Sequence, residues 1–139
     1  MATAADAEVV LRLYELRREE TMRKARAFVG LEFNPKTFEE FRALGTAMGT
    51  EQNAYWRQVL SYWEMAASMV LRGAVDPELY IDGNGEGIFL YAKFRQFHEA
   101  VQQATGMPFM RRTAEMVRTI PAAKEAYERM VKTLEARAS

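Results

Sequence analysis

The sequence predicts an all-α domain, an irregular antiparallel bundle of five or six helices with the helix at residues 50–72 at its centre. No segment alternates apolar and polar residues between turn residues, so strands are not expected. Apolar residues recur at spacings of three and four along the whole chain, which is the helical pattern. Residues 50–72 are apolar around most of the helical circumference, and such a helix needs neighbouring helices on most of its sides. Its polar residues form one narrow stripe, made of Asn53, Arg57, Ser61, Glu64, Ser68 and Arg72.

The first helix is expected over about residues 4–29, and Gly30 and Asn34-Pro35 end it. An acidic residue lies four positions before a basic one in two pairs, Glu19–Arg23 and Glu20–Lys24. Because this is the favoured order for ion pairs along a helix, the charged run at residues 17–20 is interpreted as a solvated face and not as a binding motif.

The next elements are marked by their capping residues. A short helix from about Thr37 to Met48 begins with a capping box formed by Thr37 and Glu40. Thr50 then caps the central helix, and Gly73 ends it. Asp76-Pro77 supplies the N-cap and first residue of a brief helical turn that reaches Ile81.

Two further helical regions complete the chain. One is expected over about residues 87–104 and ends at Gly106-Met107-Pro108. From Phe109 to about Arg137, apolar residues keep a heptad rhythm across Pro121. Pro121 must break or kink this helix, because it removes a backbone donor and clashes with the preceding turn. The continuous rhythm favours one kinked helix.

Composition limits the classes of function. Residues 1–139 are expected to form a single helical domain, since this length is one domain's worth of chain. Nineteen basic residues balance nineteen acidic ones, which removes the field that a non-specific nucleic-acid binder needs. The chain has no cysteine, no apolar run near the roughly 18 residues that span a bilayer, and no signal-peptide pattern at its start. We therefore expect a cytoplasmic protein that binds neither nucleic acid nor membrane.

The segment from Asp82 to Lys93 partly matches a calcium-binding EF-hand loop. Its ligand positions one, three and five and its glycine at six are filled, by Asp82, Asn84, Glu86 and Gly87. Lys93 occupies position twelve, where a bidentate glutamate belongs, so a flexible turn is favoured over a calcium site. The glycines of residues 83–87 also suggest a phosphate loop, but no strand precedes them and no Walker lysine follows. Neither a metal nor a cofactor is expected.

The sequence offers no catalytic constellation, so an enzyme is not expected. His98, the only histidine, has no partner at the spacing of a di-iron or zinc motif. Ser61 and Ser68 lie inside a helix and not on a nucleophile elbow. Glu64 lies among apolar residues of the central helix. It is expected to be largely buried and bonded to an arginine or tyrosine of another helix; a ligand-facing or catalytic acid is the alternative.

The aromatic residues of the central helix are candidates for an interaction surface. Four rings, those of Tyr55, Trp56, Tyr62 and Trp63, project to several sides, so at least one should meet a second layer, a groove or a partner. The nine methionines are interpreted mainly as core, with a promiscuous groove as the alternative. The candidate ligand or interaction residues are Glu64, Trp63, Tyr62, Trp56, Tyr91 and His98.

The run Tyr62-Trp63-Glu64, with Leu71-Arg72-Gly73-Ala74-Val75-Asp76 and then Phe89 and Phe94-Arg95, resembles a bacterial family of uncharacterised all-helical domains. In that family an aromatic-x-Glu helix ends in Gly-x-hydrophobic-Asp, and an aromatic-rich helix follows. The resemblance covers about residues 50–100 and implies no activity, substrate or cofactor. Several members look membrane-anchored at the N-terminus, and no such segment is expected here. The matching positions, Glu64, Gly73 and Asp76, all have sufficient structural explanations.

Three functions are weighed on these grounds. A non-catalytic protein–protein interaction or assembly module is favoured, most simply a homodimer, because the central helix, the heptad rhythm and the zero net charge all suit association. The alternative is a small-ligand-binding or sensory bundle with a pocket between helices 50–72 and 87–104. An enzyme ranks third.

Overall fold

The computed structural model describes residues 1–138 and, within them, contains nine α-helices, one π-helical and one 3-10 segment, and no strand. The elements are α1 (Ala4–Arg17), α2 (Glu20–Ala27), η1 (Phe28–Glu32), α3 (Phe38–Thr46), α4 (Glu51–Leu71), α5 (Pro77–Gly83), α6 (Glu86–Lys93), η2 (Arg95–Phe97), α7 (His98–Thr105), α8 (Arg111–Thr119) and α9 (Pro121–Ala138). The all-α prediction is confirmed. The predicted number of five or six helices is wrong, because three expected helices are each divided.

The first division is at Glu19, inside the helix expected over residues 4–29. Glu19 has φ −58° and ψ 145°, and its carboxylate accepts hydrogen bonds from the backbone N–H groups of Thr21 and Met22. It therefore caps α2, whereas the sequence pattern assigned it to an ion pair with Arg23. These hydrogen bonds lower the pKa of the Glu19 carboxyl.

The other two divisions follow Lys93 and Thr119. After α6 the backbone tightens into η2, and the Arg95 guanidinium donates to the carbonyl of Ala92 at 3.0 Å. Ile120 is extended, with φ −111° and ψ 116°, because the ring of Pro121 disfavours helical backbone in the residue before it. The predicted kinked helix is therefore wrong. α8 and α9 are separate helices that pack against each other.

The predicted helix ends around α4 are confirmed. The Thr50 hydroxyl accepts from Asn53 N–H at 3.1 Å. Gly73 has φ +79°, and the N–H groups of residues 73 and 74 bond the carbonyls of Val70 and Met69, which is a Schellman end. Asp76 caps α5 through Leu79 N–H. At α3, Thr37 caps as expected, but the Glu40 carboxylate bonds Lys36 N–H instead of completing a capping box.

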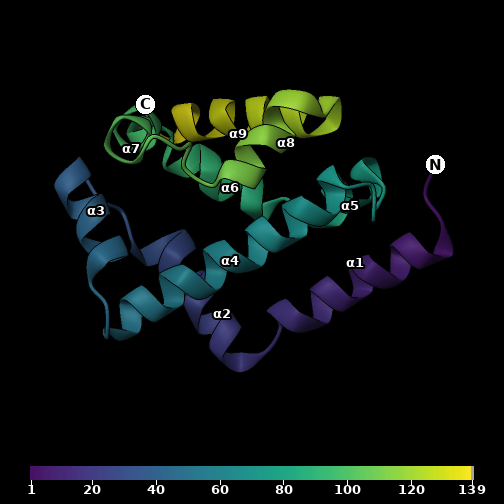
Figure 1. Cartoon of the computed structure of the whole chain (residues 1–139), viewed down its shortest axis with the longest axis horizontal. Helices are drawn as coiled ribbons and strands as arrows, with labels where there is room; N and C mark the ends of the chain where they lie inside the picture. Colours follow the sequence, from purple (N-terminus) through teal and green to yellow (C-terminus); the bar gives the residue numbers. More distant parts are fainter. Residues whose placement is uncertain (139) are drawn as a thin grey trace.

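α4 lies at the centre, as predicted, and crosses the middle of the molecule in Figure 1. α1 and α2 lie on one side of it, α6, α8 and α9 lie on the other, and α3 packs near its N-terminal end. Its fully buried side chains include Val59, Trp63, Ala66 and Ala67. α8 packs against α4 and α9, and α9 packs against α5, α6 and α8, so the heptad face is largely covered within the chain.

An aromatic cluster fills the space between α3, α4 and residues 94–109. Its members are Phe33, Phe41, Trp56, Phe94, Phe97 and Phe109. The Phe41 ring lies at the centre, 4.7 Å from Phe97 and 5.4 Å from Trp56, Phe94 and Phe109, centroid to centroid. Edge-on and offset contacts of this kind fix the ring orientations. No described helix has both the length and the apolar character needed to cross a membrane.

Candidate functional site

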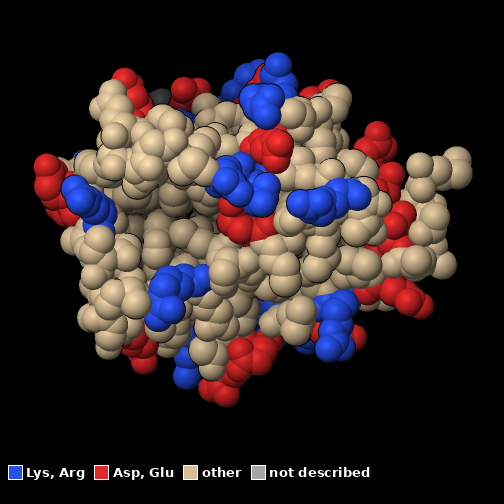
Figure 2. Space-filling model, in the orientation of Figure 1, with Lys and Arg blue, Asp and Glu red and all other residues tan. Residues whose placement is uncertain are grey.

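The candidate site is a cleft between α3, α4, α7 and the connection from α7 to α8. It has a volume of about 540 Å³. Its apolar lining comprises Phe38, Phe41, Trp56, Leu60, Val101, Ala104, Phe109 and Met110. Its polar lining comprises Arg42, Thr46, Glu64, Thr105 and Arg111. Figure 2 shows the cleft as a hollow with a mostly uncharged surface and charged groups at its edge.

The floor of the cleft is the aromatic cluster and is therefore preformed. The Trp56 ring stacks on Phe109 at 6.0 Å and meets Phe41 edge-on at 5.4 Å. Trp56 and Phe41 are 7% and 5% exposed, so the floor presents only a small part of each ring. A rigid aromatic floor of this kind binds apolar groups without first having to order itself.

Glu64 stands at the edge of the cleft, half-buried, and caps α8. One carboxylate oxygen accepts from Arg112 N–H at 2.8 Å, and the other accepts from Thr113 N–H at 2.9 Å and from the Thr113 hydroxyl at 2.6 Å. α8 has no cap of its own, because its N-cap residue, Met110, carries no side-chain oxygen to accept from the first N–H groups. The Glu64 charge therefore compensates the positive end of α8.

The prediction for Glu64 is confirmed for its hydrogen bonding and wrong for its partners. The side chain is hydrogen-bonded to another helix, as expected. Its partners are backbone amides and a threonine hydroxyl in place of an arginine or tyrosine side chain. All these bonds go to α8, so Glu64 is held as a structural cap at the edge of the cleft.

Three methionines that lie close in the sequence to residues of the cleft are exposed. Met48, Met65 and Met107 are 68%, 41% and 43% exposed. Each lies within two residues of a residue that lines the cleft. The methionines are therefore divided between core positions, such as Met22 and Met116, and these exposed positions.

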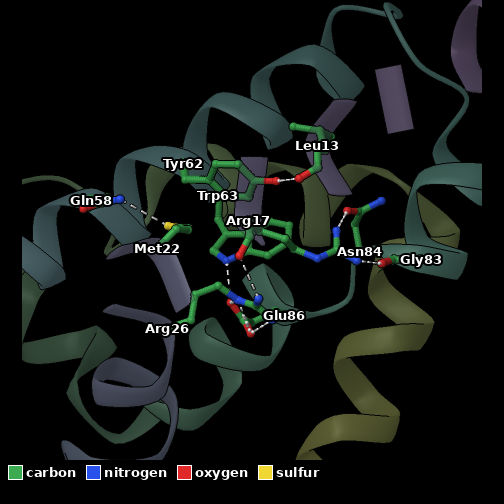
Figure 3. Close-up of polar contacts among 10 residues, drawn as sticks. All are labelled: Leu13, Arg17, Met22, Arg26, Gln58, Tyr62, Trp63, Gly83, Asn84 and Glu86. Carbon is green, nitrogen blue, oxygen red and sulfur yellow. Dashed lines mark hydrogen bonds and ion pairs between the residues drawn. The ribbon is translucent and has the colours of Figure 1, made fainter. Parts of the chain in front are cut away.

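Tyr62 and Trp63 lie outside the cleft, in a polar cluster that joins α1 and α2 to α4, α5 and α6 (Figure 3). The Glu86 carboxylate accepts from the Arg26 guanidinium at 2.9–3.1 Å and from Trp63 Nε1 at 2.9 Å. The Tyr62 hydroxyl donates to the carbonyl of Leu13. Burial raises the pKa of Tyr62, so its hydroxyl stays a neutral donor. Tyr62 and Trp63 therefore join α4 to α1 and α6 and have a structural role.

Residues of the segment that partly matches a calcium-binding loop, Asp82 to Lys93, also belong to this polar cluster. Arg17 donates to the side chain of Asn84 and to the carbonyl of Gly83, and Asn84 is buried. The flexible turn expected over residues 82–87 is shortened to residues 84 and 85, because α5 extends to Gly83 and α6 begins at Glu86. Gly87 allows α6 to approach α4, since a Cβ there would lie 3.1 Å from Trp63 Cβ.

Lys93 lies away from this loop and binds η1. Its ammonium donates to the carbonyls of Val29 and Gly30 at 2.9 and 3.0 Å. Burial lowers the pKa of Lys93 to about 8. Its two hydrogen bonds fix the position of α6 against the π-helical turn η1.

Tyr91 lines a second groove of about 690 Å³, together with Pro108, Arg111, Arg112, Ala114, Glu115, Val117, Arg118 and Tyr127. The His98 ring stacks on Tyr91 at 4.1 Å, and its Nε2 is 2.8 Å from the Tyr91 carbonyl oxygen. Burial lowers the pKa of His98 and raises the pKa values of Tyr91 and Tyr127. All three side chains are therefore neutral near pH 7.

The six predicted residues thus separate into three places. Trp56 and Glu64 meet at the cleft, Tyr91 lines the second groove with His98 stacked on it, and the other two belong to the polar cluster. The sequence pattern did not predict the rest of the cleft wall, above all Phe38, Phe109 and the two arginines at its edge. The spacing of Phe38 and Phe41 indicated a buried face of the short helix, but no signal showed that one side of it stays open.

Comparison with protein families gives one match. The family model described as "Domain of unknown function (DUF4760)" matches residues 2–120. Among curated proteins and solved structures, none matches the chain. The match includes the whole cleft and the second groove up to residue 118.

Proposed function

Since the chain belongs to the family described as "Domain of unknown function (DUF4760)", whose description assigns no activity, we propose a function on the basis of the cleft. The protein is a non-catalytic protein-binding module. In this proposal the cleft between α3, α4 and α7 holds an apolar segment of another protein. A helix with apolar side chains at positions i, i+3 or i+4 and i+7 is the usual occupant of such a groove.

The observation that carries the proposal is the apolar cleft with its aromatic floor. Met48, Met65 and Met107 are exposed on the three segments that also supply residues to the cleft. Methionine side chains are flexible and polarizable, and they adapt to the side chains of a docked segment. Exposed apolar side chains outside the cleft favour a protein segment over a molecule confined to the cleft.

The polar groups of the cleft support a binding role without catalysis. Glu64 accepts three hydrogen bonds at α8 and is committed to that cap. The remaining polar lining consists of Arg42, Arg111 and two threonines. An acid or base poised next to a nucleophile, as acid–base or covalent catalysis requires, is not part of this set.

The test is selection of a random peptide library, displayed on phage, against the purified protein. Ala104→Trp fills the cleft from an exposed position of α7, and Ala136→Trp at an exposed position of α9 is the matched control. Selected peptides should bind wild type and Ala136→Trp equally and Ala104→Trp at least about tenfold more weakly, a difference of about 1.4 kcal/mol. Failure to enrich any peptide, or equal binding to Ala104→Trp, would refute the proposal.

A second candidate function is binding of a small apolar molecule, which the cleft volume favours. About 540 Å³ lies within the usual range of roughly 300–1,000 Å³ for ligand pockets. The position of the cleft, between α4 and the second half of the segment 87–104, supports this candidate. Native mass spectrometry of the purified protein would support this candidate by showing a bound small molecule that Ala104→Trp lacks.

The homodimer stays a prediction. A second copy of the chain is the simplest partner, and light scattering at micromolar concentration would then give about twice the 16.0 kDa of one chain. A mass of 16.0 kDa would leave a different protein as the partner. One of the three reasons for a dimer is weakened, because the heptad face is largely covered by α4, α5 and α6 within the chain.

A further inference from the structure

The second groove carries a concentration of positive charge. Three arginines of α8, Arg111, Arg112 and Arg118, line it on one side, and the rings of Tyr91 and Tyr127 line it on the other. Figure 2 shows basic side chains over the region of α8, next to the hollow of the cleft, with acidic side chains among them. The only acidic residue in the lining is Glu115, so the lining carries three positive charges and one negative charge.

These arginines are free to bind an anion. Within residues 1–138, no carboxylate lies within 4.0 Å of the guanidinium of Arg111, Arg112 or Arg118. The Glu64 carboxylate beside them is already occupied by the backbone of α8. The hydroxyls of Tyr91 and Tyr127 are neutral, because burial raises their pKa values, and they do not oppose a negative charge.

The second groove and the cleft adjoin at the start of α8, where Arg111 lines both of them. Arg42 stands at another edge of the cleft, so cationic groups lie at two places around its apolar floor. A segment seated in the cleft therefore has guanidinium groups within reach at its end.

We infer that the partner segment is acidic: its apolar side chains fill the cleft, and Asp or Glu side chains next to them bind Arg112 and Arg118 in the second groove. This inference rests on the proposed function. Guanidinium groups bind carboxylates through two parallel hydrogen bonds, which gives direction as well as attraction. An acidic protein segment fits better than a nucleic acid, because the groove adjoins an apolar cleft and the whole chain has zero net charge.

The test uses the peptides selected from the phage library. Peptides that depend on the open cleft should be enriched in Asp and Glu beside their apolar residues. One such peptide is then synthesised in two forms, the selected one and one with every Asp and Glu changed to Asn and Gln. The acidic form should bind wild type about tenfold more tightly, as expected for two exposed but well-directed ion pairs, and its affinity should fall as salt is raised.

The double variant Arg112→Gln/Arg118→Gln removes two guanidinium groups that line the second groove and not the cleft. It should bind both peptide forms equally. The matched control, Arg129→Gln/Arg137→Gln, removes the same charge from exposed positions of α9 and should keep the tenfold preference. Circular dichroism of both variants should match that of wild type.

The outcomes separate the two proposals. Selected peptides without acidic residues, equal binding of the two forms to wild type, or a preference that survives Arg112→Gln/Arg118→Gln would overturn this inference and leave the protein-binding role intact. A single-stranded oligonucleotide that displaced the acidic peptide with equal affinity would also overturn it. Peptides that bind Ala104→Trp as well as wild type would overturn the protein-binding role itself.

Discussion

Replacing Glu64 with alanine should destabilise the domain through the loss of the α8 cap. The change leaves two backbone N–H groups and the Thr113 hydroxyl without their acceptor. Loss of an N-cap costs about 0.5–2 kcal/mol, and loss of a negative charge at a helix N-terminus costs about 0.3–1 kcal/mol more. The expected decrease in the free energy of unfolding is therefore about 1–3 kcal/mol. For a chain of this size that corresponds to a fall of about 3–10 °C in Tm.

Urea unfolding followed by circular dichroism measures this change, and an unaltered m-value would show that the denatured state is unchanged. Glu64→Gln keeps one oxygen acceptor and should lose about half as much free energy. The matched control is Glu128→Ala, at an exposed position of α9. Hydrogen exchange at the amides of Arg112 and Thr113 should accelerate in Glu64→Ala while exchange in α9 is unchanged. A free energy of unfolding within about 0.5 kcal/mol of wild type would refute the capping role.

The other predictions concern packing and charge. Gly87→Ala should destabilise the protein by about 1–3 kcal/mol, because its Cβ would lie 3.1 Å from Trp63 Cβ. The control, Gly83→Ala, places its Cβ where no atom lies within 4 Å and should be tolerated. Thermal unfolding of the two variants compares their stabilities. Arg26→Met should cost about 1–2 kcal/mol in urea unfolding at low salt, and equal stability of the two proteins there would contradict the role of this half-exposed ion pair. The pKa of Lys93 is about 8 in the folded state against an ordinary 10.5, so between these values the unfolded chain holds the extra proton and stability rises with pH. The free energy of unfolding of wild type relative to Lys93→Met should therefore increase from pH 8 to pH 10, and a constant difference would exclude this pKa.

The features that the sequence predicted well depend on neighbours in the chain. Thr50, Gly73 and Asp76 each act on backbone groups within four residues, so their roles follow from residue type and position alone. The division at Glu19 was missed because the same carboxylate has the spacing of an ion pair and the geometry of a cap. Local sequence does not decide between these two roles, because the docking of α2 on α4 contributes to the choice.

The candidate site depends on contacts between distant segments. The bonds from Glu64 to α8 join residues 48 and 49 positions apart, and no local pattern in the sequence indicates them. The periodicity of Phe38 and Phe41 predicts which side of α3 is buried. It does not predict that α3 and α7 stand far enough apart to leave the floor accessible, since that separation is set by the packing of the rings beneath them.

The aromatic cluster is at once part of the hydrophobic core and the floor of the cleft, and this limits where members of this family can change their binding preference. Phe41 and Trp56 serve both as hydrophobic core and as the floor of the cleft, so a substitution that reshapes the floor also removes packing, at about 3–5 kcal/mol for loss of a whole ring. Ala104, Thr105 and Arg111 line the same cleft from exposed positions, where substitutions usually change stability by less than about 0.5 kcal/mol. A new binding preference is therefore expected to arise at the edge of the cleft, over a floor that stability keeps constant.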